Sequence, residues 1–430
     1  MRTSRRALWT ASLTVILGAV VAVSPAPAPG ASSSAPSGQA HLTLPAPDGR
    51  YPVGTISLEF IDRGRANPWA ASPPYRELMV SIWYPATHTR RYALAPQMLP
   101  GAAAHFGSPD GAAAQLYRVP PGSVDWAATL TGGHEAAPVA RHGAPFPVVL
   151  YSPGLGEPRT WETTLVQDLA SRGYVVVTID HTYEASEVEF PDGQVIDSRL
   201  ATWFAQAQQH GTLLALLKKI VAVRVADVRF VINALTALDA GHNPDAGQRP
   251  LPRGLAGALD LHRIGMFGVS AGGFTAAQAM YEDPRISAGI DMDGTIEAPV
   301  PDYWAIAPVF KHGLSQPFMF MGDPKTNHHT VPSWESFWTH TPGWHLDLTL
   351  LGASGENSYK DAVPLIPQIA RQLGLPRSFV TGDIGTINPA AAVRAEEAYV
   401  SAFFDRWLRG RDGRLLDGPS LRYPQIVFIR

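Results

Sequence analysis

From residue 146 onward, apolar runs typical of buried strands alternate with segments typical of helices. The run "FPVVLYSPG" (146–154) predicts a strand that ends in turn residues, and "YVVVTIDH" (174–181) predicts a second strand. Between them, "TTLVQDLASRG" (163–173) has helical spacing and a glycine at its end. Strands that are apolar on both faces are typical of a parallel sheet covered by helices on each side.

The same alternation continues towards the C-terminus. The segment "HRIGMFGVSAGGFTAAQAM" (262–280) predicts a strand, a sharp turn and a helix. Further short apolar strands are predicted at 286–294, 317–323 and 345–352. A closing helix is predicted over 388–410, with Gly410 at its C-cap. The sequence therefore predicts an α/β protein with a mostly parallel central sheet and helices on both faces.

Two segments nearer the N-terminus alternate between apolar and polar residues. They are "YPVGTISLEFID" (51–62) and "RELMVSIWYP" (76–85), and we expect an antiparallel pair of strands that extends one edge of the sheet. The region 90–143 is rich in alanine, glycine and proline and predicts loops and short helices.

An amphipathic stretch at about 200–237 has two interpretations. Its first part, 201–223, carries large apolar side chains: Trp203, Phe204, Leu213, Leu214, Leu216 and Leu217. Amphipathic helices usually bury this face against the core. Alternatively, residues 182–225 form a cap over the site that makes transient contact with a lipid surface or with substrate.

The first 40 residues have the composition of a secretory signal peptide and a flexible leader. A basic start with "SRR" precedes an apolar run at 7–23 and then a stretch rich in alanine, proline and serine. An uncleaved membrane anchor is the alternative. We expect a secreted protein whose single domain spans 41–430, and the chain contains no cysteine for a disulfide or a lipid anchor.

The overall composition indicates a globular chain. Apolar residues make up 45% and charged residues 17% of the sequence, which is enough apolar material for a large core. The net charge of −3 and the lack of a Lys/Arg block after the N-terminus argue against nucleic-acid binding.

The pentapeptide Gly268–Val269–Ser270–Ala271–Gly272 matches the pattern G-x-S-x-G between a predicted strand and a predicted helix. In this context the serine occupies a sharp turn and its Oγ projects above the sheet as a nucleophile. The simpler alternative is a Gly/Ser turn that only closes a strand. An acyl-transfer serine also needs N–H donors for the developing oxyanion. Ala271 can supply one, and Leu155 in "YSPGLGEPRT" can supply the other.

The acid of such a site follows the serine in sequence and lies at the C-terminal end of a strand. Asp293 closes "AGIDMDG" and is the first candidate, while Asp323 closes "PFMFMGD" and is the rival. Asp291 has the same orientation as Asp293 but lies deeper in its strand.

The order of these segments resembles the secreted platelet-activating-factor acetylhydrolases and related bacterial lipases and esterases of the α/β-hydrolase fold. The matching segments are "RELMVSIWYPA", "FPVVLYSPGLGEPRT", "GYVVVTIDH", "RIGMFGVSAGGF" and "AGIDMDG". The resemblance implies Ser270 as nucleophile, Asp293 as acid, and the N–H groups of Leu155 and Ala271 as oxyanion donors. It also implies substrates that are esters of short or modified acyl groups, with no metal and no cofactor.

The chain departs from the family pattern in two places. The elbow of the family usually reads G-H-S-x-G-G, and here the histidine is replaced by Val269. The final loop of the family resembles G-x-x-H-x-x-F-x-D, whereas this chain has "GASGENSYKD". The retained positions are Gly352, Tyr359 and Asp361. The position of the catalytic histidine is taken by Gly355 or Glu356.

Several residues are candidates for the missing base. The chain has 14 histidines, none of them after His345. His328 and His329 follow the strand at 317–323, so a relocated base is one interpretation and two exposed loop histidines the other. His181 ends the strand at 174–181 and is expected to brace a loop through Asp180. Glu356 can accept a proton, but an ordinary carboxylate is a weak base towards a serine hydroxyl.

We therefore predict a secreted serine hydrolase that cleaves carboxylic esters through an acyl-enzyme. The alternative is a catalytically silent protein of the same fold that binds a lipid or an ester. The expected partner is a small-molecule or lipid ester, and the sequence makes no prediction of an oligomeric state.

Overall fold

The computed structural model describes residues 38–295 and 306–430. The predicted signal peptide lies outside these residues. The described residues belong to one compact unit, Ala35–Arg430. No helix within the described ranges combines the length and apolarity that a membrane crossing requires.

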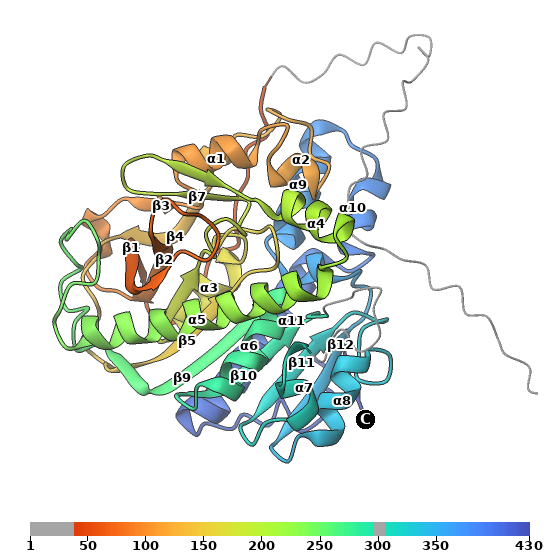
Figure 1. Cartoon of the computed structure of the whole chain (residues 1–430). Helices are drawn as coiled ribbons and strands as arrows, with labels where there is room; N and C mark the ends of the chain where they lie inside the picture. Colours follow the sequence, from red (N-terminus) through yellow and green to blue (C-terminus); the bar gives the residue numbers. More distant parts are fainter. Residues whose placement is uncertain (1–37, 296–305) are drawn as a thin grey trace, which may run out of the picture. The chain divides into compact units, whose positions relative to one another are not determined.

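An 11-stranded sheet runs through this unit (Figure 1). Its strands, in spatial order, are β13 (Ile426–Ile429), β12 (His345–Leu350), β11 (Phe318–Gly322), β10 (Ile286–Met292), β9 (Leu259–Val269), β5 (Phe146–Ser152), β6 (Val175–Ile179), β2 (Tyr75–Pro85), β1 (Val53–Ala66), β4 (Leu130–Glu135) and β3 (Leu94–Pro96). The strands from β12 to β6 in this order are all parallel. The predicted antiparallel pair, β1 and β2, is joined to this core through β2 and β6.

Helices cover both faces of the sheet, as the apolar runs predict. On one face lie α5 (Leu213–Asp239), α6 (Ala271–Glu282), α7 (Val309–His312) and α8 (Pro332–His340). On the other lie α3 (Thr163–Ser171), α9 (Ala362–Leu373) and α11 (Pro389–Arg409), and Gly410 caps α11 as predicted. Alternate residues of β5 serve the two cores: Val148 packs on the α5 side and Val149 on the α3 side. Figure 1 shows α5 lying across the first of these faces.

The predicted amphipathic stretch at 200–237 consists of two helices, α4 (Leu200–Gln209) and α5. They are separated at Gly211, which has a φ of +65° that is easy only for glycine. In α4, the Trp203 ring stacks on Trp69 at 4.1 Å between ring centroids, so one face of this ring is covered by the protein itself. The cap role of residues 182–225 and its lipid contact stay predictions.

The region 90–143 contains more regular structure than predicted. Besides α1 (Pro100–Phe106) and α2 (Ala112–Gln115), it forms β3 and β4 at the sheet edge. The prediction of only loops and short helices was wrong there because β3 is three residues long and β4, "LTGGHE", contains two glycines, so neither has a strong apolar alternation.

The parallel strands bring five loops to one edge of the sheet. The loop at 153–157 follows β5, Ser270 follows β9, Asp293 follows β10, Asp323 follows β11, and the loop at 351–361 follows β12. The C-terminal ends of neighbouring parallel strands are where open α/β sheets bind ligands. The segments that carry the predicted chemistry therefore share this edge.

Candidate active site

Ser270 occupies a strained turn between β9 and α6. Its φ of 55° and ψ of −126° lie outside the regions that ordinary residues prefer. The turn is possible because its neighbours are glycines: a Cβ atom added to Gly268 would lie 2.2 Å from the carbonyl carbon of Gly272. Ser270 is half-buried although the residues on both sides of it are buried. The turn therefore presents the Ser270 hydroxyl at the surface of the core, as the nucleophile elbow predicts.

Two backbone N–H groups beside Ser270 are available to an oxyanion. The loop after β5 approaches closely, since a Cβ atom on Gly154 would lie 3.5 Å from the Cβ of Ser270. Among the described residues, no acceptor takes a hydrogen bond from the N–H of Leu155 or of Ala271. Unused donors next to a serine are one requirement of an oxyanion hole, and the roles of Leu155 and Ala271 as donors stay predictions.

Glu356 lies against Ser270. It begins a 3-10 turn, η4 (Glu356–Tyr359), in the loop after β12. Burial alone would raise the pKa of Glu356, but the Lys360 ammonium and a hydrogen bond from the Ser270 side chain together hold it below its ordinary value of 4.5. At neutral pH the position of the missing histidine therefore holds a carboxylate that contacts the predicted nucleophile.

Lys360 connects this carboxylate to a second, buried one. Its Nζ lies 2.9 Å from Glu356 Oε1 and 2.7 Å from Glu157 Oε1, and its side chain is fully buried. Tyr117 donates a further hydrogen bond of 2.7 Å to Glu157 Oε1. Burial lowers the pKa of Lys360, but the two carboxylates outweigh this effect and raise it above its ordinary value. The lysine therefore stays charged, and its ion pair with Glu356 holds that carboxylate in place.

Asp293 and Asp323 form a second acidic pair on the neighbouring strand ends. Burial raises the pKa of Asp293 to about 7, and the carboxylates of Asp323 and Glu356 add to this rise. The backbone N–H of Asp323 donates to Asp293 Oδ1 at 3.3 Å. Asp323 Oδ2 in turn accepts the N–H of Gly355 at 2.9 Å. Asp323 thus binds the loop backbone.

Gly355 marks the place where an imidazole would start. A Cβ atom added there would lie 3.8 Å from Asp293 Oδ2. The backbone of Gly355 has a φ of 67° and a ψ of −171°, which a side chain adopts only with strain. A histidine at this position would face Asp293, whereas the glycine leaves Asp293 without that partner. The chain thus keeps the predicted acid beside an altered base position.

The histidines considered from the sequence have other contacts. His328 is buried, stacks on Trp338, and binds Asp347 Oδ2 through Nδ1 at 2.7 Å, so the expectation of two exposed loop histidines was wrong for this residue. His329 is exposed, and its Nε2 lies 2.9 Å from the carbonyl oxygen of Arg430. Its role as a relocated base stays a prediction, and within the described residues His329 forms no hydrogen bond with Ser270.

His181 braces a loop, but not through Asp180. Asp180 instead forms an ion pair with Arg159. His181 binds Ser152 and Asp227, at 2.9 Å each. The sequence could not indicate these partners because Asp227 lies 46 positions away, on α5.

The retained residues of the final loop anchor it to the core. The Tyr359 hydroxyl donates to the carbonyl of Gly322 at 2.7 Å. Asp361 accepts hydrogen bonds from the N–H groups of Thr163 and Thr164 at the start of α3, and from the side chain of Gln97. The loop is therefore held in place through two of the three retained positions, Tyr359 and Asp361.

Residues 37–315 match the family described as platelet-activating factor acetylhydrolase, isoform II. The chain belongs to this family. A probable 1-alkyl-2-acetylglycerophosphocholine esterase of Arthroderma benhamiae is 29% identical over 422 residues, which is 93% of this chain and 96% of the relative. The platelet-activating factor acetylhydrolase of Cavia porcellus is 28% identical over 35% of each chain. A solved ferulic acid esterase from Streptomyces cinnamoneus is 33% identical, covers 90% of this chain and 99% of its own, and has a TM-score of 0.68.

These relatives confirm the α/β-hydrolase fold and the class of carboxylic-ester hydrolases for this platelet-activating factor acetylhydrolase family member. They give no support to the alternative of a silent binding protein. The family match ends at residue 315, before the loop that carries Gly355 and Glu356.

Proposed function

We propose that this protein hydrolyses carboxylic esters with Ser270 as nucleophile and Glu356 as the base. Ser270 Oγ attacks the ester carbonyl, its proton passes to Glu356, and the N–H groups of Leu155 and Ala271 stabilise the oxyanion. The proton then passes to the leaving alcohol, and an acyl-enzyme remains on Ser270. Water, which loses a proton to Glu356, attacks the acyl carbon, and the proton returns to Ser270 as the acid leaves.

The observation that carries the proposal is the hydrogen bond between the Ser270 side chain, on its strained turn, and Glu356. Beside Ser270 lie two N–H groups that have no acceptor among the described residues. Because Lys360 holds the pKa of Glu356 below its ordinary value, Glu356 stays ionised into the acid range. A base with a low pKa is inefficient at neutral pH. We therefore expect ester hydrolysis to be slower than it would be with a histidine as the base, and to persist at low pH.

The proposed substrates are esters with a short or modified acyl group. The Arthroderma relative is named for an acetyl ester of a glycerophosphocholine, and the Streptomyces structure for ferulic acid. Parallel assays with p-nitrophenyl acetate, an acetylated glycerophosphocholine and a ferulate ester would define the acyl group.

Labelling and turnover test the proposed nucleophile together. We expect a fluorophosphonate probe to label the wild-type protein at Ser270, and p-nitrophenyl acetate to be hydrolysed. Ser270→Ala should remove both. Ser287→Ala is the matched control, because Ser287 lies near the start of β10 and its hydroxyl donates to the carbonyl of Ile264 in β9, away from the proposed site. Hydrolysis that survives Ser270→Ala would contradict the proposal.

We also propose that the N-terminal 40 residues direct secretion, on the basis of their charge and apolar pattern. Expression of the full chain in a secreting host should place a shortened protein in the medium, with a new N-terminus before about residue 41. An uncleaved chain that stays with the cells would contradict this.

A further inference from the structure

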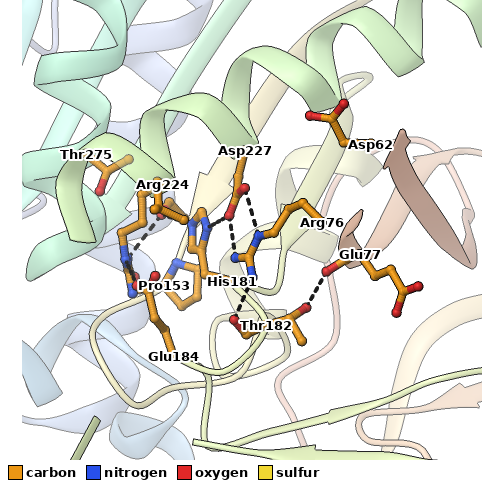
Figure 2. Close-up of polar contacts among 12 residues, drawn as sticks. Asp62, Arg76, Glu77, Pro153, His181, Thr182, Glu184, Arg224, Asp227 and Thr275 are labelled. Carbon is orange, nitrogen blue, oxygen red and sulfur yellow. Dashed lines mark hydrogen bonds and ion pairs between the residues drawn. The ribbon is translucent and has the colours of Figure 1, made fainter. Parts of the chain in front are cut away.

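A buried charged cluster contacts the loop at 153–157, which carries Leu155 and is called the oxyanion loop below, and it takes no direct part in the proposed reaction. We define it as Arg76, His181, Glu184, Arg224 and Asp227, all buried. Figure 2 shows Asp227 between His181 and Arg76, and Arg224 beside Pro153 and Glu184. Buried charges are costly unless they are paired, so the presence of these five groups here needs an explanation.

Arg224 contacts the backbone of the oxyanion loop directly. Its Nη1 donates to the carbonyl of Pro153 at 2.7 Å, and its Nη2 donates to the carbonyl of Gly154 at 3.2 Å. Its Nε donates to Glu184 Oε2 at 2.7 Å, which balances the charge. One guanidinium therefore holds two successive peptide groups.

The second of these contacts determines where the Leu155 N–H points. The Gly154 carbonyl and the Leu155 N–H belong to one planar peptide group, which is trans. In a trans peptide the C=O and N–H bonds point in opposite directions. Because the Gly154 oxygen is bound to Arg224, the Leu155 N–H is directed away from the cluster, and no described acceptor takes it up.

The rest of the cluster fixes the end of β5, from which the loop starts. Burial lowers the pKa of His181 to about 4, and the charge of Arg224 contributes to this, so the imidazole is neutral at physiological pH. Neutral His181 can donate through Nδ1 to Asp227 and accept through Nε2 from the Ser152 hydroxyl, each at 2.9 Å. Ser152 is fully buried, so this Ser–His–Asp chain has no access to substrate.

We propose that Arg224 is a positioning residue for ester hydrolysis, which aims the Leu155 N–H at the oxyanion by holding the Pro153 and Gly154 carbonyls. The inference rests on the proposed function, because it requires the tetrahedral intermediate to form at Ser270. Arg224 acts on the transition state through the loop and makes no contact with substrate.

The test measures kcat, KM and transition-state-analogue affinity in Arg224→Lys, Arg224→Met and Glu184→Gln, with p-nitrophenyl acetate and a boronic acid inhibitor. Loss of a whole oxyanion donor costs about 10²–10³ in kcat. We expect Arg224→Met to lower kcat at least tenfold within that limit with little change in KM. Boronate affinity should fall in parallel, and Arg224→Lys, which can keep one carbonyl contact, should recover part of the loss. Glu184→Gln, which only loosens Arg224, should have an intermediate effect.

Val228→Ala is the control for general destabilisation. Val228 is a buried apolar residue one turn further along α5. It should lower the melting temperature and leave kcat and boronate affinity unchanged. If Ser270→Ala abolishes activity but all three cluster variants keep wild-type kcat and boronate affinity, the inference on Arg224 is overturned alone. If Ser270→Ala stays active, the proposed function itself fails.

Discussion

At the scale of single residues, the acidic groups around Ser270 differ because their neighbours differ. Lys360 keeps Glu356 ionised, whereas no cation within the described residues forms an ion pair with Asp293, whose pKa is raised to about 7. Two carboxylates this close repel each other, which favours a proton on one of them. The raised pKa of Asp293 and the lowered pKa of Glu356 indicate that Asp293 is the carboxyl that keeps its proton.

Replacing Asp293 by asparagine should change stability in a pH-dependent way. The folded-state pKa of about 7 lies above the ordinary 3.8, so the folded protein keeps a proton that the unfolded chain releases. Wild-type stability from this group is present below pH 3.8 and is lost as pH rises to about 7. Asparagine does not titrate, so Asp293→Asn avoids this loss. The free energy of unfolding of the variant, minus that of wild type, should therefore be larger at pH 8 than at pH 4 by up to about 4 kcal/mol, at ~1.4 kcal/mol per pH unit.

Urea unfolding at both pH values measures this difference, with the exposed Asp417→Asn as the control that should show none. An Asp293→Asn protein that gains no stability at pH 8 relative to pH 4 would contradict the raised pKa.

Replacing Glu356 by histidine should improve the base. The new imidazole would start beside Ser270, with a pKa near the working pH, where general-base catalysis is most efficient. We expect Glu356→His to raise kcat/KM at pH 8 by about tenfold or more. Asn357→His places the same group at the next position and should give no gain. Equal rates in wild type and Glu356→His would show that base strength does not limit the reaction.

At the scale of elements, the site depends on how the loop after β12 is fixed to α3. Asp361 satisfies two N–H groups at the start of this helix, where a carboxylate also interacts favourably with the helix dipole. The loop that carries Glu356 and Lys360 is therefore held by a helix that lies 198 positions earlier in the sequence.

Removing this anchor should cost both stability and activity. Asp361→Ala loses the contacts to Thr163, Thr164 and Gln97, and we expect the free energy of unfolding to fall by about 2–3 kcal/mol. Exposed Asp417→Ala should change it by less than about 1 kcal/mol. Guanidinium chloride unfolding measures both, and an Asp361→Ala protein as stable as wild type would refute the anchoring role.

The elements that were predictable from sequence are those with a strong local pattern. The core strands β5 and β6 are continuous apolar runs, as is the second half of β9 from Ile264, and α11 has a helical period with a glycine cap. β13 was not predicted, because its four residues gain their strand structure only by pairing with β12. Gly211 indicated the break between α4 and α5, but the amphipathic pattern continues on both sides of it, so the sequence was interpreted as one stretch.

At the scale of the whole molecule, the sheet assembles the site from distant segments. The elbow at Ser270 was predictable because its glycines and flanking elements are local. The ion pair of Lys360 with Glu157 was not, because 203 positions separate them and only the fold brings them together. The same holds for Arg224, which reaches back 70 positions to the Gly154 carbonyl.

The most direct test of the account is the pH dependence of kcat/KM for p-nitrophenyl acetate in wild type and in Glu356→Gln. We predict that wild-type activity falls on the acid side only below pH 4.5, because the pKa of Glu356 lies below that value. We also predict a loss of about 10²-fold or more in Glu356→Gln. Wild-type rates in Glu356→Gln, or an acid limb near pH 6.5 as for a histidine, would contradict the account.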